Sequence, residues 1–236
     1  MIIKKELRQN LWKVVAGFLV LMVVAVFSVA SFPVIKQVFS KGPPPGLKLP
    51  PQAREQFAAL TDFKHYVVSQ WFNKNLLQLG FILAVLLGIG AIAGEIQAKT
   101  AEFLLSKPIS RTRAILEKYC TLCCILFAAV LVSSILVYPT TLIIKEQISI
   151  VRVLLAILPI FPALLVVYSY TLFFSTIFND QIKTAGAAIG LSVIFIILGV
   201  FEKTQKFSIF YYADATKVLL KGQIPWANIL GLLAFA

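Results

Sequence analysis

Few residues of this chain have the types and spacing that catalysis or metal binding needs. The thiols of Cys120, Cys123 and Cys124 lie in one short stretch, and the single histidine is His65. Neighbouring cysteines on a helix can bind a soft metal ion, but no histidine or acid accompanies them. An odd number of cysteines inside an apolar run is not a disulfide framework. We therefore expect apolar wall residues, a surface histidine, no catalytic residue and no metal site.

The most informative polar segment is 94–118, GEIQAKTAEFLLSKPISRTRAILEK. Four of its residues share one face of a helix at the spacing expected for an amphipathic element, namely Ile96, Thr100, Phe103 and Leu104. Pro108 ends that helix because the residue before a proline resists the α conformation, and Ser110 can cap a second helix. The pattern predicts a short helix lying across one mouth of a helical bundle. A solvated amphipathic linker would have the same composition.

Composition places these residues in a membrane protein. The chain has 236 residues, of which 59% are hydrophobic and 14% charged, with a mean hydropathy of +0.89. A soluble domain is about 45–50% apolar and about 25% charged, so a soluble globular enzyme is excluded, and so is a disordered chain. The net charge of +12 comes from short segments between apolar runs. There it sets topology and meets lipid headgroups, so we expect no nucleic-acid partner.

The apolar runs predict an all-α integral membrane protein with six transmembrane helices. A spanning helix needs about 20 apolar residues, and the expected spans are 14–35, 76–93, 119–144, 153–178, 184–201 and 226–236. The last would cover only about 16 Å, so we expect a truncated C-terminus. The small residues Ser28 and Ala30 resemble a signal-peptide cleavage site, but the first run is longer than such a peptide's core. We therefore expect an uncleaved first span.

The segments around the spans predict the orientation. Residues 1–13 form either an amphipathic helix in the membrane interface or a basic flank of the first span. Basic residues are denser around 94–118 and before the first span, so the N-terminus and 94–118 are expected on the cytoplasmic side. Segment 36–74 is then the extracytoplasmic loop, with short helices at 52–60 and 63–72. The aromatic residues of the second short helix should lie at headgroup depth.

No ionisable residue lies centrally in an expected span, which argues against a proton-driven transporter. The energy for any transport must therefore come from elsewhere. A family resemblance fits this view, and the residues that carry it are Glu95, Lys99-Thr100-x-Glu102, Leu104-Leu105-Ser106-x-Pro108-Ile109-Ser110-Arg111 and Lys118. These residues resemble the cytoplasmic signature of type-2 ABC transporter permeases. Residues 5–8 and 210–226 also resemble segments of that family. One departure is Lys99, which stands where the family usually has glycine.

The resemblance implies a permease subunit in the cell membrane that works with an ABC ATP-binding subunit. The implied assembly holds two permease copies and two ATP-binding subunits, and the ATP and Mg²⁺ are used by the partner. The residues implied in ATPase coupling are Glu95, Lys99, Thr100, Glu102, Leu104, Leu105, Ser106, Pro108 and Arg111. Those implied in an N-terminal interfacial helix are Lys4, Lys5, Leu7 and Arg8. The chain has no Walker A motif, so it is expected to carry no nucleotide site or cofactor of its own.

Three functional classes remain after these observations. The first is the transmembrane permease of an ABC exporter that moves a hydrophobic, amphipathic or peptide-like substrate outward. The second is a membrane-embedded enzyme, which would need paired carboxylates, several histidines or an activated cysteine. The third is a non-transporting membrane partner of an ABC ATPase, such as a sensor, immunity or maturation subunit. Vectorial release of substrate from vesicles would separate the first class from the third.

Overall fold

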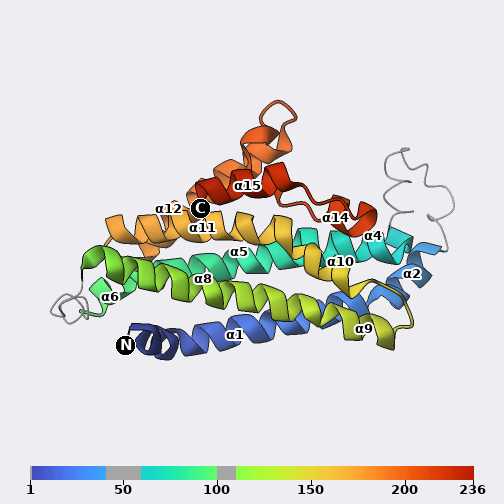
Figure 1. Cartoon of the computed structure of the whole chain (residues 1–236), viewed down its shortest axis with the longest axis horizontal. Helices are drawn as coiled ribbons and strands as arrows, with labels where there is room; N and C mark the ends of the chain where they lie inside the picture. The colour runs from blue at the N-terminus through green and yellow to red at the C-terminus, as the bar shows by residue number, and fades with distance from the viewer. Residues whose placement is uncertain (1, 41–59, 100–109) are drawn as a thin grey trace.

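The computed structural model describes residues 2–40, 60–99 and 110–236 of the chain (Figure 1). All regular secondary structure in these ranges is helical. The helices run roughly side by side along the long axis of the molecule, as Figure 1 shows. The all-α fold expected from the sequence is therefore confirmed for the described residues.

Five helical stretches are long and apolar enough to cross a membrane. They are formed by α1 (Ile2–Ala30) with α2 (Phe32–Ser40), by α4 (Phe63–Val67), η1 (Val68–Leu76) and α5 (Leu77–Ala91), by α8 (Arg111–Ile135) with α9 (Val137–Ile143), by α10 (Ile150–Leu155) with α11 (Ile157–Ile177), and by α12 (Gln181–Val200). The expected sixth span corresponds to α15 (Trp226–Phe235), a shorter apolar helix. Five of the six expected spans therefore have a spanning helix.

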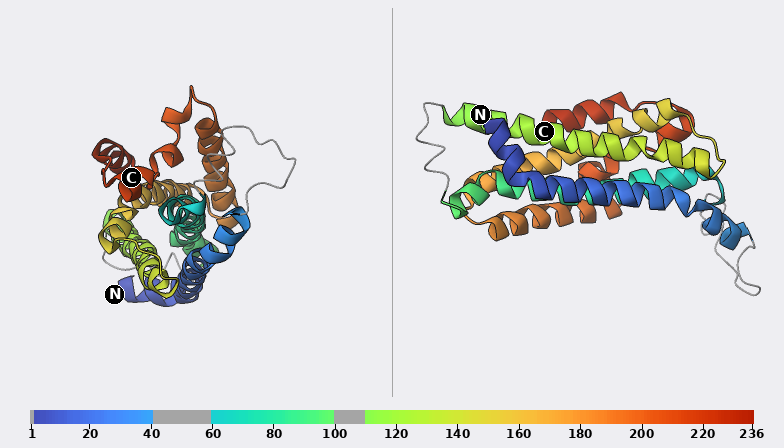
Figure 2. Two further views of the ribbon diagram at one scale, coloured as in Figure 1. Left: turned by 90° about the vertical axis from the view of Figure 1, so that its right-hand side faces the viewer. Right: turned by 90° about the horizontal axis from the view of Figure 1, so that it is seen from below.

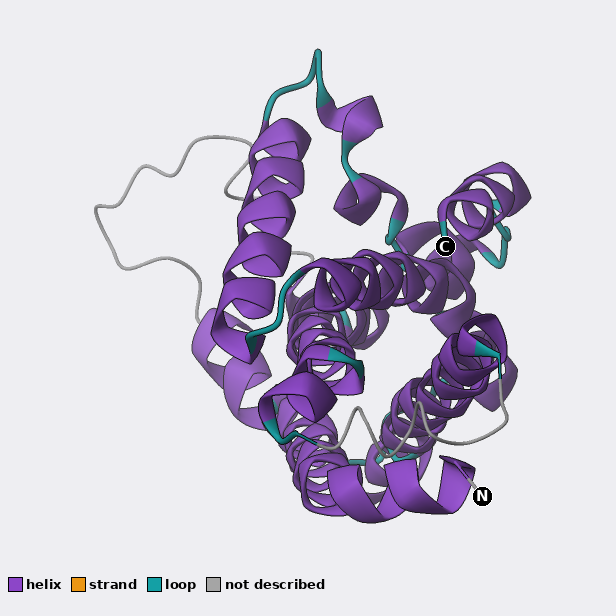
Figure 3. Ribbon diagram, turned by 90° about the vertical axis from the view of Figure 1, so that its left-hand side faces the viewer, coloured by secondary structure: helices purple, strands orange, loops and turns teal. Residues whose placement is uncertain are grey.

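Helix α11 lies in the middle of the bundle, and α12 lies at its margin. In their most apolar windows, 61% of the α10–α11 stretch is buried against 17% of α12. The end-on view of Figure 3 shows α12 at the edge of the bundle, where it packs against α11 and α5. Helix α5 approaches α11 closely because it offers glycine there. A Cβ atom on Gly88 would lie 2.6 Å from Thr171 Cγ2.

The two ends of the bundle hold different segments. One end carries the N-terminus and the starts of α8 and α12 (Figure 1); we call it the proximal end. The other carries α2, α4, α9, α10 and α14 (Thr216–Lys221); we call it the distal end. The N-terminal helix and the described parts of segment 94–118, residues 94–99 and 110–118, thus lie at the same end, as the predicted topology requires.

The N-terminal helix differs from the expectation in its boundary. Residues 1–13 were expected as a separate element, but α1 runs without interruption from Ile2 to Ala30. Its first turns nevertheless lie at a steep angle to the rest of the helix, as the right-hand view of Figure 2 shows. The side chains of the expected interfacial residues lie outside the described part of the structure, namely Lys4, Lys5, Leu7 and Arg8.

The second span begins earlier than expected. Residues 63–74 were assigned to the extracytoplasmic loop, yet α4, η1 and α5 form one helical stretch from Phe63 to Ala91. Phe63 and Trp71 are buried in the bundle, and their depth in the membrane stays a prediction. The ring of Phe63 packs edge-on against that of Phe32, with centroids 5.0 Å apart. No proline or glycine interrupts the helix before Gly80, so it continues into the core. The expected helix at 52–60 falls almost wholly outside the described residues.

The segment between α12 and α15 is a chain of short elements, comprising η2 (Gln205–Phe207), α13 (Ile209–Tyr212) and α14. Helix α14 ends at Lys221, and Gly222 follows it with a left-handed φ of 69°. A glycine in this conformation is a common helix terminator because it has no Cβ to clash with the preceding turn.

Candidate functional site: the junction after the second span

Helix α5 is interrupted at the proximal end, immediately before the informative polar segment. It ends at Ala91, and Ile92 departs from helical geometry with φ −125° and ψ −53°. The short helix α6 (Ala93–Gln97) then begins in a new direction. A break of this kind leaves backbone N–H and C=O groups without partners in the helix. In a membrane-embedded bundle those groups need other partners.

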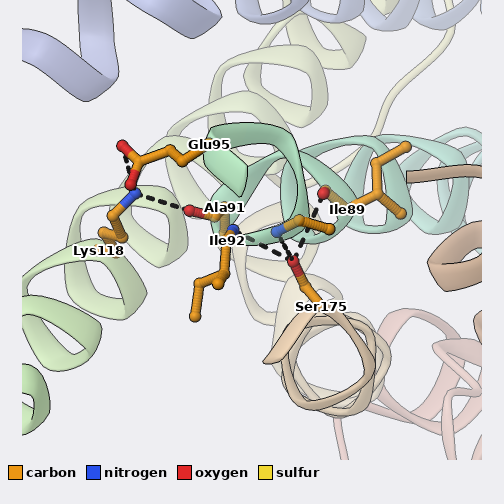
Figure 4. A network of polar contacts seen from close by, with 7 residues as sticks. Ile89, Ala91, Ile92, Glu95, Lys118 and Ser175 are labelled. Atoms are coloured by element: carbon orange, nitrogen blue, oxygen red, sulfur yellow. Dashed lines mark hydrogen bonds and ion pairs between the residues drawn. The ribbon is translucent and has the colours of Figure 1, made fainter. Parts of the chain in front are cut away.

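Ser175 of α11 satisfies the amide groups at the break. Its Oγ accepts hydrogen bonds from the N–H of Ile92 at 3.1 Å and of Ala93 at 2.9 Å. The same hydroxyl donates to the carbonyl of Ile89 at 3.4 Å. Figure 4 shows the serine placed against the interrupted turn. One buried side chain thus compensates for the interruption and fixes α5 against α11.

Lys118 of α8 satisfies the carbonyl side of the same break. Its Nζ donates to the carbonyl oxygen of Ala91 at 2.6 Å and lies 3.0 Å from Glu95 Oε1 (Figure 4). The Lys118 side chain is 2% exposed and that of Glu95 is 7% exposed. Removing one partner of such a buried pair leaves an uncompensated charge and is strongly destabilising. The pair therefore holds α6 firmly against α8.

Helix α12 completes the junction. A Cβ atom on Gly94 would lie 2.8 Å from the side-chain Nε2 of Gln181, the first residue of α12. That helix is capped by Asp180, whose carboxylate accepts from the N–H of Ile182 at 2.8 Å. Four of the five spanning stretches therefore contact one another around the break after α5. A displacement of α6 would act on all of them.

A family model described as ABC-2 family transporter protein matches residues 1–210, a range that includes this whole junction. The chain belongs to the ABC-2 family of transporter proteins. Searches of curated proteins and of solved structures gave no match. This ABC-2 protein is thus the membrane subunit of an ABC transporter, and membership implies an ABC ATP-binding subunit as its partner. Membrane subunits of the family normally lack an ATPase site of their own. The resemblance read from the sequence is confirmed.

The structure describes only part of the coupling set expected for this ABC-2 subunit. Glu95 lies in the junction, paired with Lys118 from the same signature. Ser110 caps α8 as predicted, accepting from the N–H of Arg113 at 3.3 Å. Arg111 is the first residue of α8, and its side chain lies outside the described part. Six expected coupling residues also lie outside it, namely Thr100, Glu102, Leu104, Leu105, Ser106 and Pro108.

The helix expected to run through Ile96 and Thr100 is interrupted before it reaches Thr100. Helix α6 ends at Gln97, and Lys99 has a left-handed φ of 56°. An L-residue in this conformation costs roughly 1–2 kcal/mol because its Cβ meets the carbonyl oxygen. Glycine has no such cost, which gives a physical reason for the glycine usual in the family at this position. In this ABC-2 protein the turn forms even though lysine occupies it.

Two residues of the junction were not expected from the sequence. Ser175 is one of several small polar residues in the apolar spans. Gln181 follows Asn179 and Asp180, which resemble loop residues before the fifth span. Neither belongs to a recognisable motif. A serine in an otherwise apolar span is a weak signal of a backbone contact. The sequence does not show which helix Ser175 faces; the packing of the bundle does.

The residues that could do covalent chemistry are the cysteines, which follow Lys118 along α8, and a histidine at the distal end. Cys120 and Cys124 are exposed on α8, and Cys123 is partly buried there. The exposed His65 contacts Asp62 at the distal end, with Nδ1 and Oδ2 2.7 Å apart. Within residues 2–40, 60–99 and 110–236, no group of three or more His, Cys, Asp and Glu side chains is placed to hold a metal ion.

Proposed function

We propose that this chain is the transmembrane permease subunit of an ATP-driven exporter, coupled to its ATP-binding subunit through segment 94–118. The observation that carries the proposal is the buried pair of Glu95 and Lys118, with Nζ and Oε1 3.0 Å apart. The pair ties together the two ends of the polar segment. A force applied to the residues between them therefore reaches the spans instead of being lost in a loose loop.

The contacts around the pair define the route of that force. From Glu95 it passes to α8 through Lys118, and from the break at Ile92 it passes to α11 through Ser175. Gly94 lies against Gln181 at the start of α12. Coupling needs an element with differential contacts in two states. The junction would move as a rigid unit with segment 94–118. The contact that differs between the two states would be the one with the ATP-binding subunit.

The proposed assembly has two permease copies and two ATP-binding subunits, with the N-terminus and segment 94–118 in the cytoplasm. The margin position of α12 supports a second permease copy, since its apolar side chains Ile189, Val193 and Ile196 are all exposed. Native mass spectrometry of the purified complex should give two copies of each subunit. A stable and active complex with one copy of each would contradict this stoichiometry.

The proposed cargo is hydrophobic, amphipathic or peptide-like and moves outward. The support is the apolar character of the spans, whose windows have mean hydropathies between 1.7 and 2.7. Inverted vesicles that hold the complex should accumulate a lipophilic fluorescent dye in the presence of ATP. Vesicles in which the cargo stimulates ATP hydrolysis but does not move would assign the chain to the non-transporting class.

The coupling role is tested by substitutions in segment 94–118 of the full complex. Glu102→Ala and Arg111→Ala should insert and fold normally but lose the ATP-binding subunit, because charge-assisted contacts at an interface are strong. Losing one partner of a buried charge pair costs about 2–5 kcal/mol, which weakens docking roughly thirtyfold or more. Pro108→Ala should keep docking but uncouple hydrolysis, because the short helix would then run on and point elsewhere.

A matched control is available on the first turn of α8. Arg113 is exposed and pairs with Glu117 within its own helix at 3.0 Å, so Arg113→Ala should leave docking within about a factor of five. The measurements are co-purification of the ATP-binding subunit and transport-linked hydrolysis. Wild-type behaviour from Glu102→Ala, Arg111→Ala and Pro108→Ala would make the segment a solvated linker.

The orientation is tested with cysteines placed in a variant whose own cysteines are serine. A cysteine at Gln52 should react with a membrane-impermeant thiol reagent in intact cells, because the loop between the first two spans is placed outside. A cysteine at the exposed Gln97 should react only after the membrane is opened. The reverse pattern would overturn the topology.

A further inference from the structure

A basic cavity lies at the distal end, away from the junction. Its volume is about 460 Å³, and its walls come from three helices and one loop. The lining residues are Lys64 of α4, Gln147, Ile148 and Ser149 of the loop before α10, Arg152 of α10, and Leu219 of α14. A volume of about 300–1,000 Å³ is typical of sites for small ligands.

Positive charge dominates this cavity. Lys64 and Arg152 come from segments far apart in the sequence, and no acidic residue is among the lining residues. Across the described ranges, neither cation forms an ion pair within the chain. Two cations around one concavity with no acid in its lining attract an anion, because low-dielectric walls focus their field.

The two acids nearest in sequence to the lining residues are bound elsewhere. Glu146 pairs with Lys36, with Oε1 and Nζ 3.0 Å apart. Asp62 accepts from the backbone N–H of His65 at 3.1 Å and contacts its ring nitrogen. Burial raises the pKa of Asp62, but the hydrogen bonds and charge of His65, together with the charge of Lys64, outweigh it and hold that pKa below its ordinary value. Both carboxylates thus make their hydrogen bonds to residues outside the cavity.

The donors of the cavity are positioned for an oxyanion. Arg152 is half-buried, and its Nη1 donates to the carbonyl of Leu219 at 3.4 Å. A guanidinium has five N–H donors, so this contact anchors the group while most of its donors stay available. The hydroxyl of Ser149 does not cap α10, and the side chain of Gln147 is exposed. Both can add hydrogen bonds to a bound anion.

We propose that this distal cavity binds a phosphate group, held by the guanidinium of Arg152 and the ammonium of Lys64. The planar fork of an arginine matches the oxygen geometry of a phosphate, and lysine adds a point charge. The phosphate can belong to the headgroup of an anionic phospholipid or to a soluble phosphorylated molecule. The site does not depend on the coupling role of segment 94–118.

The test has a lipid arm and a soluble arm, both on the full chain in nanodiscs. In the first, native mass spectrometry counts phosphatidylglycerol retained by the protein from mixed phosphatidylcholine discs. In the second, ³¹P line broadening reports binding of inorganic phosphate in discs of pure phosphatidylcholine. In the arm that shows binding for wild type, Arg152→Gln should weaken the affinity about tenfold and Lys64→Gln about fivefold. Arg152→Lys should fall between wild type and Arg152→Gln.

Lys217→Gln is the matched control, because Lys217 is an exposed lysine of α14 at the same end and does not line the cavity. Phosphatidylglycerol retained by wild type and the control but lost from both cavity variants identifies a lipid site. The same pattern with inorganic phosphate identifies a soluble ligand. Circular dichroism and gel filtration must show that each variant is folded. Equal binding by cavity variants and control in both arms would overturn the proposal.

Discussion

The second span is irregular at both of its ends, and the two irregularities are compensated by different chemistry. At the distal end its backbone widens into the π-helix η1, and at the proximal end it breaks after Ala91. The proximal break is held by a buried ion pair between Glu95 and Lys118 and by one hydroxyl. The distal irregularity is held by two uncharged asparagine side chains, one of which donates to the carboxylate of Asp214.

Two asparagines of η1 make the distal contacts. Asn73 donates to Asp214 Oδ1 at 2.7 Å and accepts from the N–H of Ala215 at 3.0 Å. Asn75 donates to Ser28 Oγ of α1 at 2.7 Å. Short neutral side chains lose little when one partner is removed, because water or a neighbour can replace it at the end of a bundle. A buried charge has no such replacement, so the proximal end should be the more sensitive of the two.

The largest effect is expected from Lys118→Met, which removes the ammonium that lies 3.0 Å from the buried carboxylate of Glu95. Breaking a buried pair in this way should lower the free energy of unfolding by about 3–5 kcal/mol. The measurement is thermal unfolding in detergent, followed by tryptophan fluorescence. The double variant Glu95→Leu with Lys118→Met should recover most of the loss, because well-packed apolar residues can replace a buried ion pair.

The same double variant also separates stability from coupling. If the pair transmits force from the ATP-binding subunit, the recovered protein should bind that subunit but no longer couple hydrolysis to transport. Wild-type coupling in a stable double variant would leave the pair with a purely structural role. A wild-type melting curve for Lys118→Met alone would remove the contrast between the two ends.

A smaller effect is expected from Ser175→Ala, which leaves the amides of Ile92 and Ala93 without their acceptor. An unsatisfied buried donor costs about 1–3 kcal/mol. Thr176→Ala is the matched control, because Thr176 is the next residue and its hydroxyl bonds only to a carbonyl of its own helix. Equal melting curves for the two variants would show that other groups satisfy the break.

At the distal end Asn73→Ala should cost about 1–2 kcal/mol, the sum of a few net hydrogen bonds. Asn73→Asp should cost more, because a carboxylate cannot donate to Asp214 and repels it. The same fluorescence assay measures both, with Ser69→Ala on the exposed side of η1 as the control. A loss from Asn73→Ala as large as that from Lys118→Met would contradict the difference between the two ends.

The smallest effect is expected from Lys99→Gly, which should raise the free energy of unfolding by no more than about 1 kcal/mol. Glycine removes the left-handed strain but has more conformational entropy to lose on folding. Lys145→Gly is the distal counterpart, because Lys145 follows α9 with a φ of 59°. Both variants should unfold at a slightly higher temperature than wild type, and Lys99→Gly should still bind the ATP-binding subunit. Lower melting of both would show that their side chains make contacts that outweigh the strain.

Local patterns along the chain predicted much of the fold. The hydropathy runs located five spanning helices to within a few residues at most of their ends, and Ser110 marked where α8 begins. The sequence assigned residues 63–74 to the loop because Asn73 and Lys74 resemble loop residues, whereas the structure has one helical stretch from Phe63 to Ala91. In the bundle, Asn73 donates to Asp214, which precedes α14, and to Thr216, the first residue of α14, and its own helix continues through it.

The sequence by itself determined that this chain is an α-helical membrane protein with a polar segment between its second and third spans, and that this segment resembles the ABC-2 signature. These properties depend on runs of about 20 residues and on short motifs, which are readable without a partner helix. Only the tertiary structure decided that Glu95 pairs with Lys118 and that Ser175 accepts from the broken turn. Those contacts depend on which face of one helix meets which face of another, and that is settled by packing over the whole bundle.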